Sequence, residues 1–306
     1  MKPKPFQWLG GKYRLADKII GMFPSHKIYV EVCGGSASIL FSKPASTSKL
    51  EIYNDVDSML VNFFRVLRDK TQFDEFLRMV ALTPYSREEW GMCVDTIDDG
   101  EDPVVKAWKF YVGIRQSFGG MFGKSWGFST GTVSCAEKFL NSIELMPYFH
   151  RRISRVQIEH VDAIKCLELY DGKKTLFYLD PPYVPETRSG ADYKYEMTYQ
   201  DHEKLISALL KVKGMVILSG YKNKLYETLE LANWRRQDFK MQLLISGKTK
   251  QKSLGDEDEQ VEAKDANRID CVWLNRQAQS SEGAQAGLWD VGSQSESSDI
   301  DDEESA

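Results

Sequence analysis

An apolar stretch that begins at Leu176 ends in Asp180, Pro181, Pro182 and Tyr183, whose types suit chemistry on an amino group. Proline lacks the amide hydrogen that a sheet ladder needs, so a strand must stop here. The Asp180 carboxylate and the Pro181 carbonyl can both accept hydrogen bonds from the exocyclic amino group of a nucleobase, and Tyr183 offers a face for stacking. Two such acceptors draw the amino nitrogen toward tetrahedral geometry and make it more nucleophilic. An ordinary turn capped by Asp180 is the alternative.

Two further acids, Glu31 and Asp55, also follow apolar stretches and favour a nucleoside pocket. Glu31 leads into a turn of small residues that lets a ligand approach the backbone. The members of this turn are Cys33, Gly34, Gly35 and Ser36. Asp55 follows the Glu31 turn after one helix and one strand, the spacing at which a carboxylate usually accepts hydrogen bonds from two ribose hydroxyls. Because the dinucleotide glycine fingerprint and the P-loop are both missing, S-adenosylmethionine, a nucleoside with a sulfonium cation, fits better. For each acid alone, turn chemistry at a strand end is an equally good interpretation.

Seven short apolar runs are expected to form the strands that position these acids. They span residues 27–35, 49–55, 155–162, 175–183, 214–221, 268–275 and, more weakly, 235–246. Helical spacing of apolar residues occurs between many of them, as in 57–69 and 201–212. Strands that alternate with helices predict an α/β fold with a seven-stranded, mostly parallel sheet. Ligands bind beyond the carboxyl ends of such strands, where Glu31, Asp55 and Asp180 stand.

Residues 70–150 interrupt this alternation with helical patterns. Helices are expected over 72–80, 86–94 and 103–113. Ser86 and Glu89 predict a capping box at the start of the second helix. A stretch rich in glycine and aromatic residues follows and predicts a hairpin. We therefore expect a mainly helical insert between two parts of one cofactor-binding domain, residues 1–69 and 151–277.

Charge is distributed unevenly along the 306 residues. Residues 278–306 contain eight acids and no Lys or Arg, and their composition predicts a disordered, Ser-rich tail. The net charge of −5 therefore hides an excess of basic residues in the body of the chain, which permits a nucleic-acid partner. No apolar run is long enough to cross a membrane. The scattered, odd number of cysteines favours a reducing cytoplasm, and neither cysteines nor histidines have the spacing of a metal site.

The insert has the composition of a DNA-binding surface, because no acid occurs from Pro103 to Ala136. The candidates for DNA contact are Lys109, Arg115, Lys124 and Trp126. Basic groups contact phosphates or guanine edges, and a glycine-rich hairpin can enter a groove. For Arg115 and Lys124 a solvated surface is the alternative.

Together these motifs resemble the Dam-like family of DNA adenine-N6 methyltransferases, in the order that places the target-recognition insert before DPPY. The resemblance covers most of residues 6–275 and implies a Rossmann-like class I methyltransferase fold. The segment WLGGKYRL resembles the family's W-x-G-G-K start, which implies that Trp8, Gly10, Gly11 and Lys12 contact the cofactor or shape its pocket.

The same resemblance implies roles for three acids. Asp55 is expected on the ribose hydroxyls and Asp180 beside both the cofactor and the target amino group. Asp162 is expected near the adenine ring of the cofactor, although a helix N-cap explains it equally well. Two departures, Cys33 for the usual Phe and Ala37 for a usual Gly, predict a looser pocket. The insert lacks the Asn-Val-Pro-x-Gly run of GATC-specific members, so the target sequence does not carry over.

The expected function is direct methyl transfer from S-adenosylmethionine to N6 of a flipped adenine in double-stranded DNA, by a cytoplasmic monomer that needs no metal. Within enzymes, an RNA adenine or a cytosine amino group is the alternative target. An inactive DNA-binding relic of the same fold is a second alternative, which the intact DPPY disfavours. A nicotinamide oxidoreductase is disfavoured by the incomplete glycine fingerprint.

Overall fold

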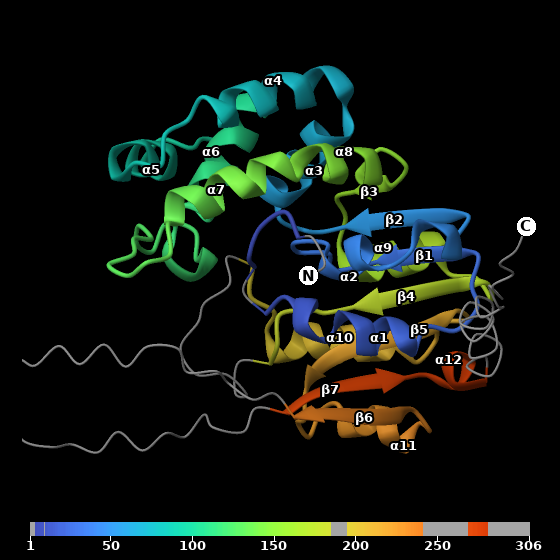
Figure 1. Ribbon diagram of the computed structural model, residues 1–306. Helices are drawn as coiled ribbons and strands as arrows, with labels where there is room; N and C mark the ends of the chain where they lie inside the picture. The colour runs from blue at the N-terminus through green and yellow to red at the C-terminus, as the bar shows by residue number, and fades with distance from the viewer. Residues whose placement is uncertain (1–3, 9, 185–194, 241–268, 281–306) are drawn as a thin grey trace, which may run out of the picture.

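The computed structural model describes residues 4–8, 10–184, 195–240 and 269–280, which contain a seven-stranded sheet between helices (Figure 1). In spatial order the strands are β3 (Gln157–Glu159), β2 (Leu50–Asn54), β1 (Ile28–Glu31), β4 (Thr175–Leu179), β5 (Met215–Tyr221), β7 (Ile269–Leu274) and β6 (Arg235–Lys240). The predicted α/β fold and its seven strands are confirmed. Within the described residues the strands are shorter than the apolar runs, because the polar ends of those runs form turns and helix caps; residues 241–246 and 268 of two predicted runs lie outside the described residues.

The order of the strands creates a switch point between β1 and β4. β1 pairs in parallel with β2 on one side and with β4 on the other. The chain winds outward from β1 to β3 and then returns to β4, so the carboxyl ends of β1 and β4 face the crevice where open sheets bind ligands. β7 runs antiparallel to β5 and β6. Its first residues therefore lie at the same edge as the last residues of the parallel strands.

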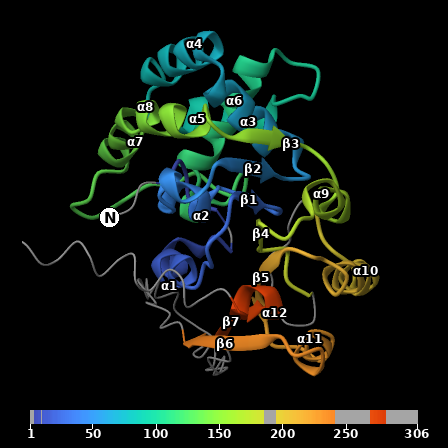
Figure 2. The same cartoon turned by 90° about the vertical axis from the view of Figure 1, so that its right-hand side faces the viewer.

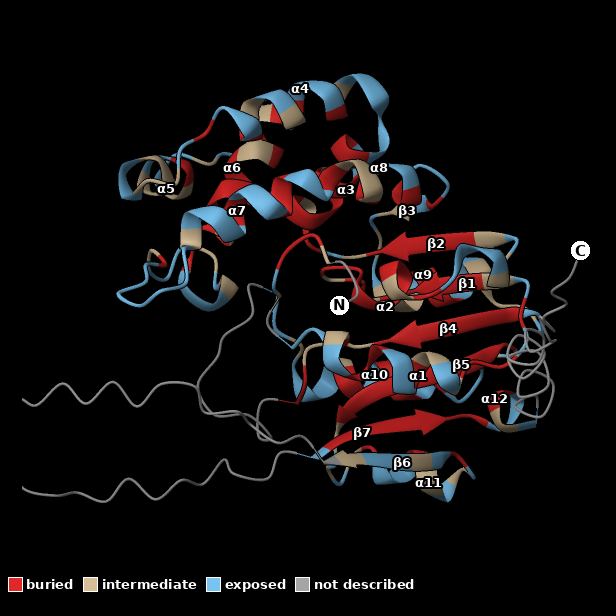
Figure 3. Cartoon of the chain, in the orientation of Figure 1, coloured by how far each residue is buried: buried red, intermediate tan, exposed pale blue. Residues whose placement is uncertain are grey.

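Helices cover both faces of the sheet (Figure 2). α1 (Ala16–Gly21) and α2 (Ser38–Ser42) lie on one face, and α9 (Ala163–Tyr170), α10 (Tyr199–Leu209) and α11 (Glu227–Leu231) on the other. Alternate residues of β4 serve opposite cores, with Leu176 and Tyr178 in one and Phe177 and Leu179 in the other. Burial on both sides, visible in Figure 3, explains why the central strands are almost continuously apolar.

The segment between β2 and β3 forms a helical lobe beside the sheet (Figure 1). It contains α3 (Ser58–Arg68), α4 (Lys70–Ala81), α5 (Arg87–Asp95), α6 (Pro103–Arg115), α7 (Cys135–Glu144) and α8 (Met146–Ile153). The capping box predicted at Ser86 is wrong, because the Ser86 side chain makes no capping bond. Its backbone N–H donates instead to Gln116 Oε1 at 3.1 Å. α5 nevertheless starts directly after Ser86.

The glycine-rich stretch after α6 closes as a hairpin-like loop. Ser117 and Trp126 form an antiparallel bridge, and the Phe118 N–H donates to the Ser125 carbonyl at 2.8 Å. The loop includes the short 3-10 helix η3 (Phe118–Gly120) instead of a strand ladder. Glycines with positive φ make this compact path possible.

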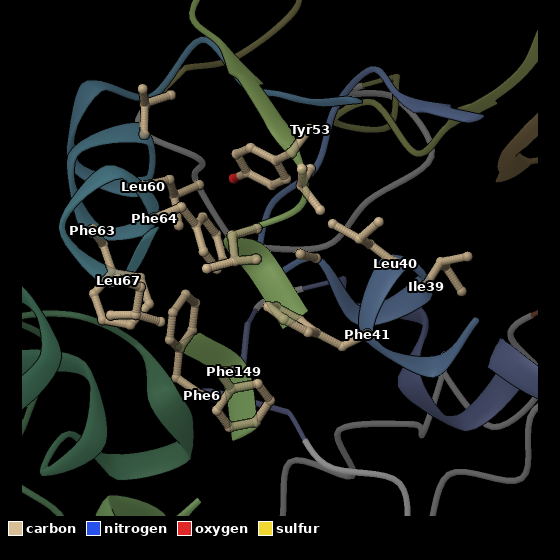
Figure 4. Packing of buried hydrophobic residues seen from close by; sticks show 14 of the residues in the cluster. Phe6, Ile39, Leu40, Phe41, Tyr53, Leu60, Phe63, Phe64, Leu67 and Phe149 are labelled. Carbon is tan, nitrogen blue, oxygen red and sulfur yellow. The ribbon is translucent and has the colours of Figure 1, made fainter. Parts of the chain in front are cut away.

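Aromatic packing joins the helical lobe to the sheet (Figure 4). Phe64 of α3 lies 4.6 Å from Tyr53 of β2 between ring centroids. Phe41 of α2 lies 4.9 Å from Phe149 of α8 in the same way. One continuous core therefore runs from the sheet into the lobe, and it fixes the lobe's loops relative to the carboxyl edge of the strands.

Residues 278–280, expected to open the acidic tail, belong instead to a described helix. This helix is α12 (Arg276–Ser280), and its Ala278 is fully buried. Residues 281–306 lie outside the described residues. Within the described part of the chain, no helix is long and apolar enough to cross a membrane, and no group of three or more potential ligands is placed to hold a metal ion. All five cysteines are described and free.

Candidate active site

A cavity of about 920 Å³ opens at the carboxyl ends of β1, β2 and β4. Its lining includes every residue predicted to bind the cofactor or to act in catalysis: Trp8, Gly10, Gly11, Lys12, Glu31, Cys33, Gly34, Gly35, Ser36, Asp55, Asp162, Asp180, Pro181, Pro182 and Tyr183. Residues that are far apart in the sequence therefore meet where the strand order predicts a ligand. A cavity of this volume accommodates a nucleoside with a side chain.

The glycine-rich turn after β1 is tied to the end of β2. A Cβ on Gly34 would lie 2.1 Å from the Tyr53 ring, so only glycine fits there. The Tyr53 hydroxyl donates to the Gly35 carbonyl at 2.8 Å, and the Gly35 N–H donates to Asp55 Oδ2 at 2.8 Å. Asp55 Oδ1 accepts from the Asp57 N–H at 2.9 Å. The turn and the carboxylate predicted to bind ribose are thus preorganised as one unit.

Ala37 occupies a backbone position that favours glycine. Its φ of 55° and ψ of 34° are left-handed, directly before α2. An L-residue in this conformation costs roughly 1–2 kcal/mol, which gives a physical reason for the glycine that the family resemblance leads one to expect. Ala37 is fully buried, whereas Cys33 lines the cavity. A looser pocket remains a prediction for Cys33, while Ala37 adds backbone strain.

Burial perturbs the two carboxyl groups that follow β1 and β2. It raises the pKa of Glu31 to about 8, although the Tyr29 hydroxyl donates to Glu31 Oε2 at 2.9 Å. Burial also raises the pKa of Asp55 to about 6, against the backbone hydrogen bonds that favour its ionised form. A cation or hydroxyl donors that enter the cavity would stabilise the charged carboxylates.

We therefore expect S-adenosylmethionine to bind more tightly as the pH rises from about 5 to about 7.5. In the empty protein, the raised pKa values of Asp55 and Glu31 contribute stability that is lost as the pH rises through about 6 and about 8. A cationic nucleoside would bind their ionised forms, so its binding would release protons. The increase in unfolding temperature at a fixed cofactor concentration, measured across this pH range, checks the prediction. Constant affinity would contradict it, and Asp55→Asn should weaken the dependence near pH 6.

Asp180 directly follows β4 and belongs to a buried charged cluster. Asp180 Oδ1 lies 3.2 Å from Lys12 Nζ and accepts from the Tyr183 hydroxyl at 3.2 Å. Lys12 Nζ also donates to the Gly10 carbonyl at 2.8 Å. Burial raises the pKa of Asp180, while the nearby Lys12 ammonium opposes this rise. The N-terminal motif and the DPPY motif are therefore held together by an ion pair.

The Tyr183 ring is largely enclosed by protein. The Lys12 ammonium lies over the ring at 4.6 Å from its centroid, and the Tyr221 ring lies 4.3 Å away between centroids. Only 7% of Tyr183 is exposed, so a base could reach only a small part of the ring. Stacking of a base on Tyr183 stays a prediction.

The helix-cap interpretation of Asp162 is confirmed, whereas its place near the adenine ring of the cofactor stays a prediction. Its side chain caps α9 by accepting from the Ile164 N–H at 2.8 Å, and the residue also lines the cavity. A helix cap therefore holds this acid at the cavity wall.

The four predicted DNA contacts occupy different environments. Lys124 is exposed and lines the cavity, as do Met121 and Phe122 of the same loop. Trp126 lies outside the cavity lining, stacked on Phe128 at 6.0 Å between centroids. Arg115 donates to the Lys138 carbonyl at 3.2 Å.

The structure corrects the prediction for Lys109. This residue is buried inside the helical lobe, where it forms an ion pair with Glu101 and donates to the Thr96 carbonyl at 3.0 Å. The face of α6 that carries Lys109 packs against other parts of the helical lobe. The Lys109 ammonium therefore does not lie on a surface that DNA could contact.

Comparison with known proteins supports the resemblance read from the motifs. Residues 8–90 and 115–241 match the model of the family described as D12 class N6 adenine-specific DNA methyltransferase. The chain belongs to this family. It is also 22% identical over 211 residues to the DNA N-6-adenine-methyltransferase of Escherichia phage P1, a match that covers 67% of this chain and 27% of that relative. The chain thus spans well under half of the length of this curated relative.

Membership of the D12 methyltransferase family excludes the nicotinamide oxidoreductase reading. The matched segments contain the WLGGK start, the turn after β1 and DPPY, on which the resemblance was based. They also contain Arg115, Lys124 and Trp126, whereas Lys109 falls between them.

Sequence reasoning missed Asp270, an acid that contacts two residues of this D12 methyltransferase site. Asp270 Oδ1 accepts from the Tyr183 hydroxyl at 3.2 Å and lies 3.7 Å from Lys12 Nζ. A search for acids at the ends of parallel strands overlooks it, because it stands at the start of antiparallel β7. The signal in the sequence is an acid placed between Ile269 and Cys271 in an otherwise apolar strand.

Proposed function

We propose that the protein transfers the methyl group of S-adenosylmethionine to N6 of adenine in double-stranded DNA. The observation that carries this proposal is that Asp180 shares one cavity with Glu31 and Asp55, in a chain of the D12 methyltransferase family. The cavity thus combines acceptors for an amino group with carboxylates that suit a cationic nucleoside.

The residues around the cavity fit this methyl donor. Asp55 would accept hydrogen bonds from the ribose hydroxyls, and Asp162 would lie near the adenine ring of the cofactor. Glu31 would favour the positive charges of the donor, which gives a role to an acid at a position where burial disfavours its ionised form. When bound, S-adenosylmethionine supplies a methyl group on a positively charged sulfur.

Asp180 and the Pro181 carbonyl would grip the target amino group. Both accept hydrogen bonds from its hydrogens, and they stabilise the positive charge that develops on the nitrogen. The raised pKa of Asp180 also makes its carboxylate a better acceptor for the proton that the nitrogen must release. No nucleophilic side chain is required, because the amino nitrogen attacks the methyl group directly.

The insert predicted over residues 70–150 is proposed as the DNA reader, with 1–69 and 151–277 as the cofactor-binding part. Its glycine-rich loop reaches the cavity through Gly120, Met121, Phe122 and Lys124. A flipped adenine would pass this loop on its way to Asp180, since base flipping brings the target out of the duplex.

Sequencing DNA from cells that express the protein, with detection of modified bases, tests the proposal. We expect N6-methyladenine in expressing cells and none above background in cells that express Asp180→Ala. Methylation confined to cytosine N4 or to RNA would favour the alternative targets. No modification in either nucleic acid, combined with cofactor binding, would favour the inactive relic.

Replacing Lys124 by alanine is expected to weaken DNA binding almost uniformly across sequences. One lost phosphate contact should reduce the slope of log K against log salt by about 1. Binding isotherms at several salt concentrations measure this slope. The matched control is Lys213→Ala, because Lys213 is exposed just before β5, at the opposite edge of the sheet from the cavity. Equal slopes for the two variants would contradict a DNA-facing role for Lys124.

A further inference from the structure

Asp270 is the second residue of β7, which runs antiparallel to β5. In the sheet register it lies opposite Tyr221 of β5 and Phe239 of β6. Because β7 runs against its neighbours, the start of this strand reaches the carboxyl edge where Asp180 stands. The residue is 8% exposed and does not line the cavity, so it does not face a ligand itself.

Asp270 and three neighbouring residues form a closed set of contacts. Lys12 Nζ lies 3.2 Å from Asp180 Oδ1 and 3.7 Å from Asp270 Oδ1. The Tyr183 hydroxyl lies 3.2 Å from each of the same two carboxylate oxygens. Asp270 therefore touches both Lys12 and Tyr183, which contact Asp180, and within the described part of the chain these two residues link it to the cavity.

The charges of this cluster do not cancel. Two carboxylates share the Lys12 ammonium, so the cluster carries one negative charge when all three groups are ionised. A negative charge placed beside the reacting groups favours a sulfonium donor and the positive charge that develops on the amino nitrogen. Asp270 also contributes to the raised pKa of Asp180, after burial, while Lys12 opposes the rise.

We propose that Asp270 is a positioning residue for amino-methyl transfer, which holds Lys12 and Tyr183 against Asp180 and supplies a second negative charge to the cluster. This inference rests on the proposed function. Asp270 acts through its neighbours and not on the substrate, so its loss should affect turnover more than binding.

Asp270→Asn is the first test, because it keeps the size of the side chain and removes the charge. We expect kcat to fall roughly 10- to 100-fold, since small misplacements of reacting groups are costly, with smaller changes in KM for DNA and cofactor. The acid limb of the kcat profile should also move to lower pH. Removal of the Asp270 charge lowers the pKa of Asp180, so the ionised acceptor persists at lower pH.

The pH readout can be interpreted from the groups that interact with Asp180 among the described residues. Lys12, Tyr183 and Asp270 act on its titration, and Glu31, Cys33, Tyr178 and Tyr226 respond to its charge. Asp270→Ala, which removes the same charge with a smaller side chain, repeats the test if the asparagine variant does not fold. Asp238→Asn is the matched control, because Asp238 lies on neighbouring β6, pairs with Arg236 at 2.8 Å and is 43% exposed.

The outcomes separate this inference from the proposed function. Wild-type transfer to adenine with a slower Asp270→Asn variant and a shifted acid limb supports the inference. Wild-type transfer with kcat unchanged in Asp270→Asn overturns it and leaves the proposed function intact. A fall in kcat with an unmoved acid limb also overturns it, since a purely structural role explains that pattern. Absence of transfer by the wild-type protein overturns both.

Discussion

Replacing Asp180 by alanine is expected to lower kcat for methyl transfer at least about 1,000-fold, while the protein stays folded and still binds S-adenosylmethionine. The variant loses an acceptor that grips the amino group. Lys12 keeps its hydrogen bond to the Gly10 carbonyl at 2.8 Å and its approach to Asp270 at 3.7 Å, so the buried ammonium is not left without acceptors. Single-turnover transfer of a labelled methyl group to DNA measures the effect.

The cofactor affinity of the same variant provides the control. Glu31, Asp55 and the turn after β1 are untouched, so calorimetric titration should still show binding. Asp180→Asn keeps one acceptor oxygen but loses the charge, and its rate should lie between those of the wild type and the alanine variant. Normal turnover by Asp180→Ala would refute the assignment of this residue.

Replacing Glu51 by alanine is expected to give a large loss of stability. Glu51 of β2 is buried, and it accepts from Lys43 Nζ at 2.6 Å and from Arg152 Nη1 at 2.5 Å. Arg152 belongs to α8, so this carboxylate joins the helical lobe to the sheet. Its removal leaves two buried cations without their main partner, which costs about 3–5 kcal/mol. We expect the unfolding temperature to fall by roughly 10 °C.

An exposed ion pair offers the matched control for this effect. Asp74 pairs with Lys70 on the surface of α4, where 58% and 70% of the two side chains are exposed. Asp74→Ala should therefore change stability by less than about 0.5 kcal/mol. Thermal unfolding of both variants, followed by circular dichroism, makes the comparison. Similar unfolding temperatures for the two variants would show that the contacts of Glu51 with Lys43 and Arg152 do not stabilise the packing of the helical lobe against the sheet.

The sheet and most of the cavity could be predicted because their signals are local. Each central strand is buried on both faces and is therefore a run of mostly apolar residues in the sequence. Glu31, Asp55 and Asp180 each stand at the end of such a run. Prolines mark the end of β4, and small residues mark the turn after β1. The strand ends were less certain, because residues such as Asp162 read equally well as part of a run or as a helix cap.

The remaining features depend on contacts that no local pattern records. Lys109 looks like a DNA contact in a basic, aromatic stretch, but the packing of α6 turns it toward Glu101 inside the lobe. Asp270 becomes part of the site only because β7 is antiparallel, and strand direction is not visible in a short apolar run. Ala278 likewise looks like the start of a polar tail until the packing of α12 against the sheet buries it.

The most direct test of the central claim is mass spectrometry of nucleosides from a DNA duplex of mixed sequence, incubated with the purified protein and S-adenosylmethionine that carries a labelled methyl group. We expect the label in N6-methyladenine, formed by the wild type and not by Asp180→Ala. Label in 4-methylcytosine alone, or no label in the DNA despite measurable cofactor binding, would contradict the account.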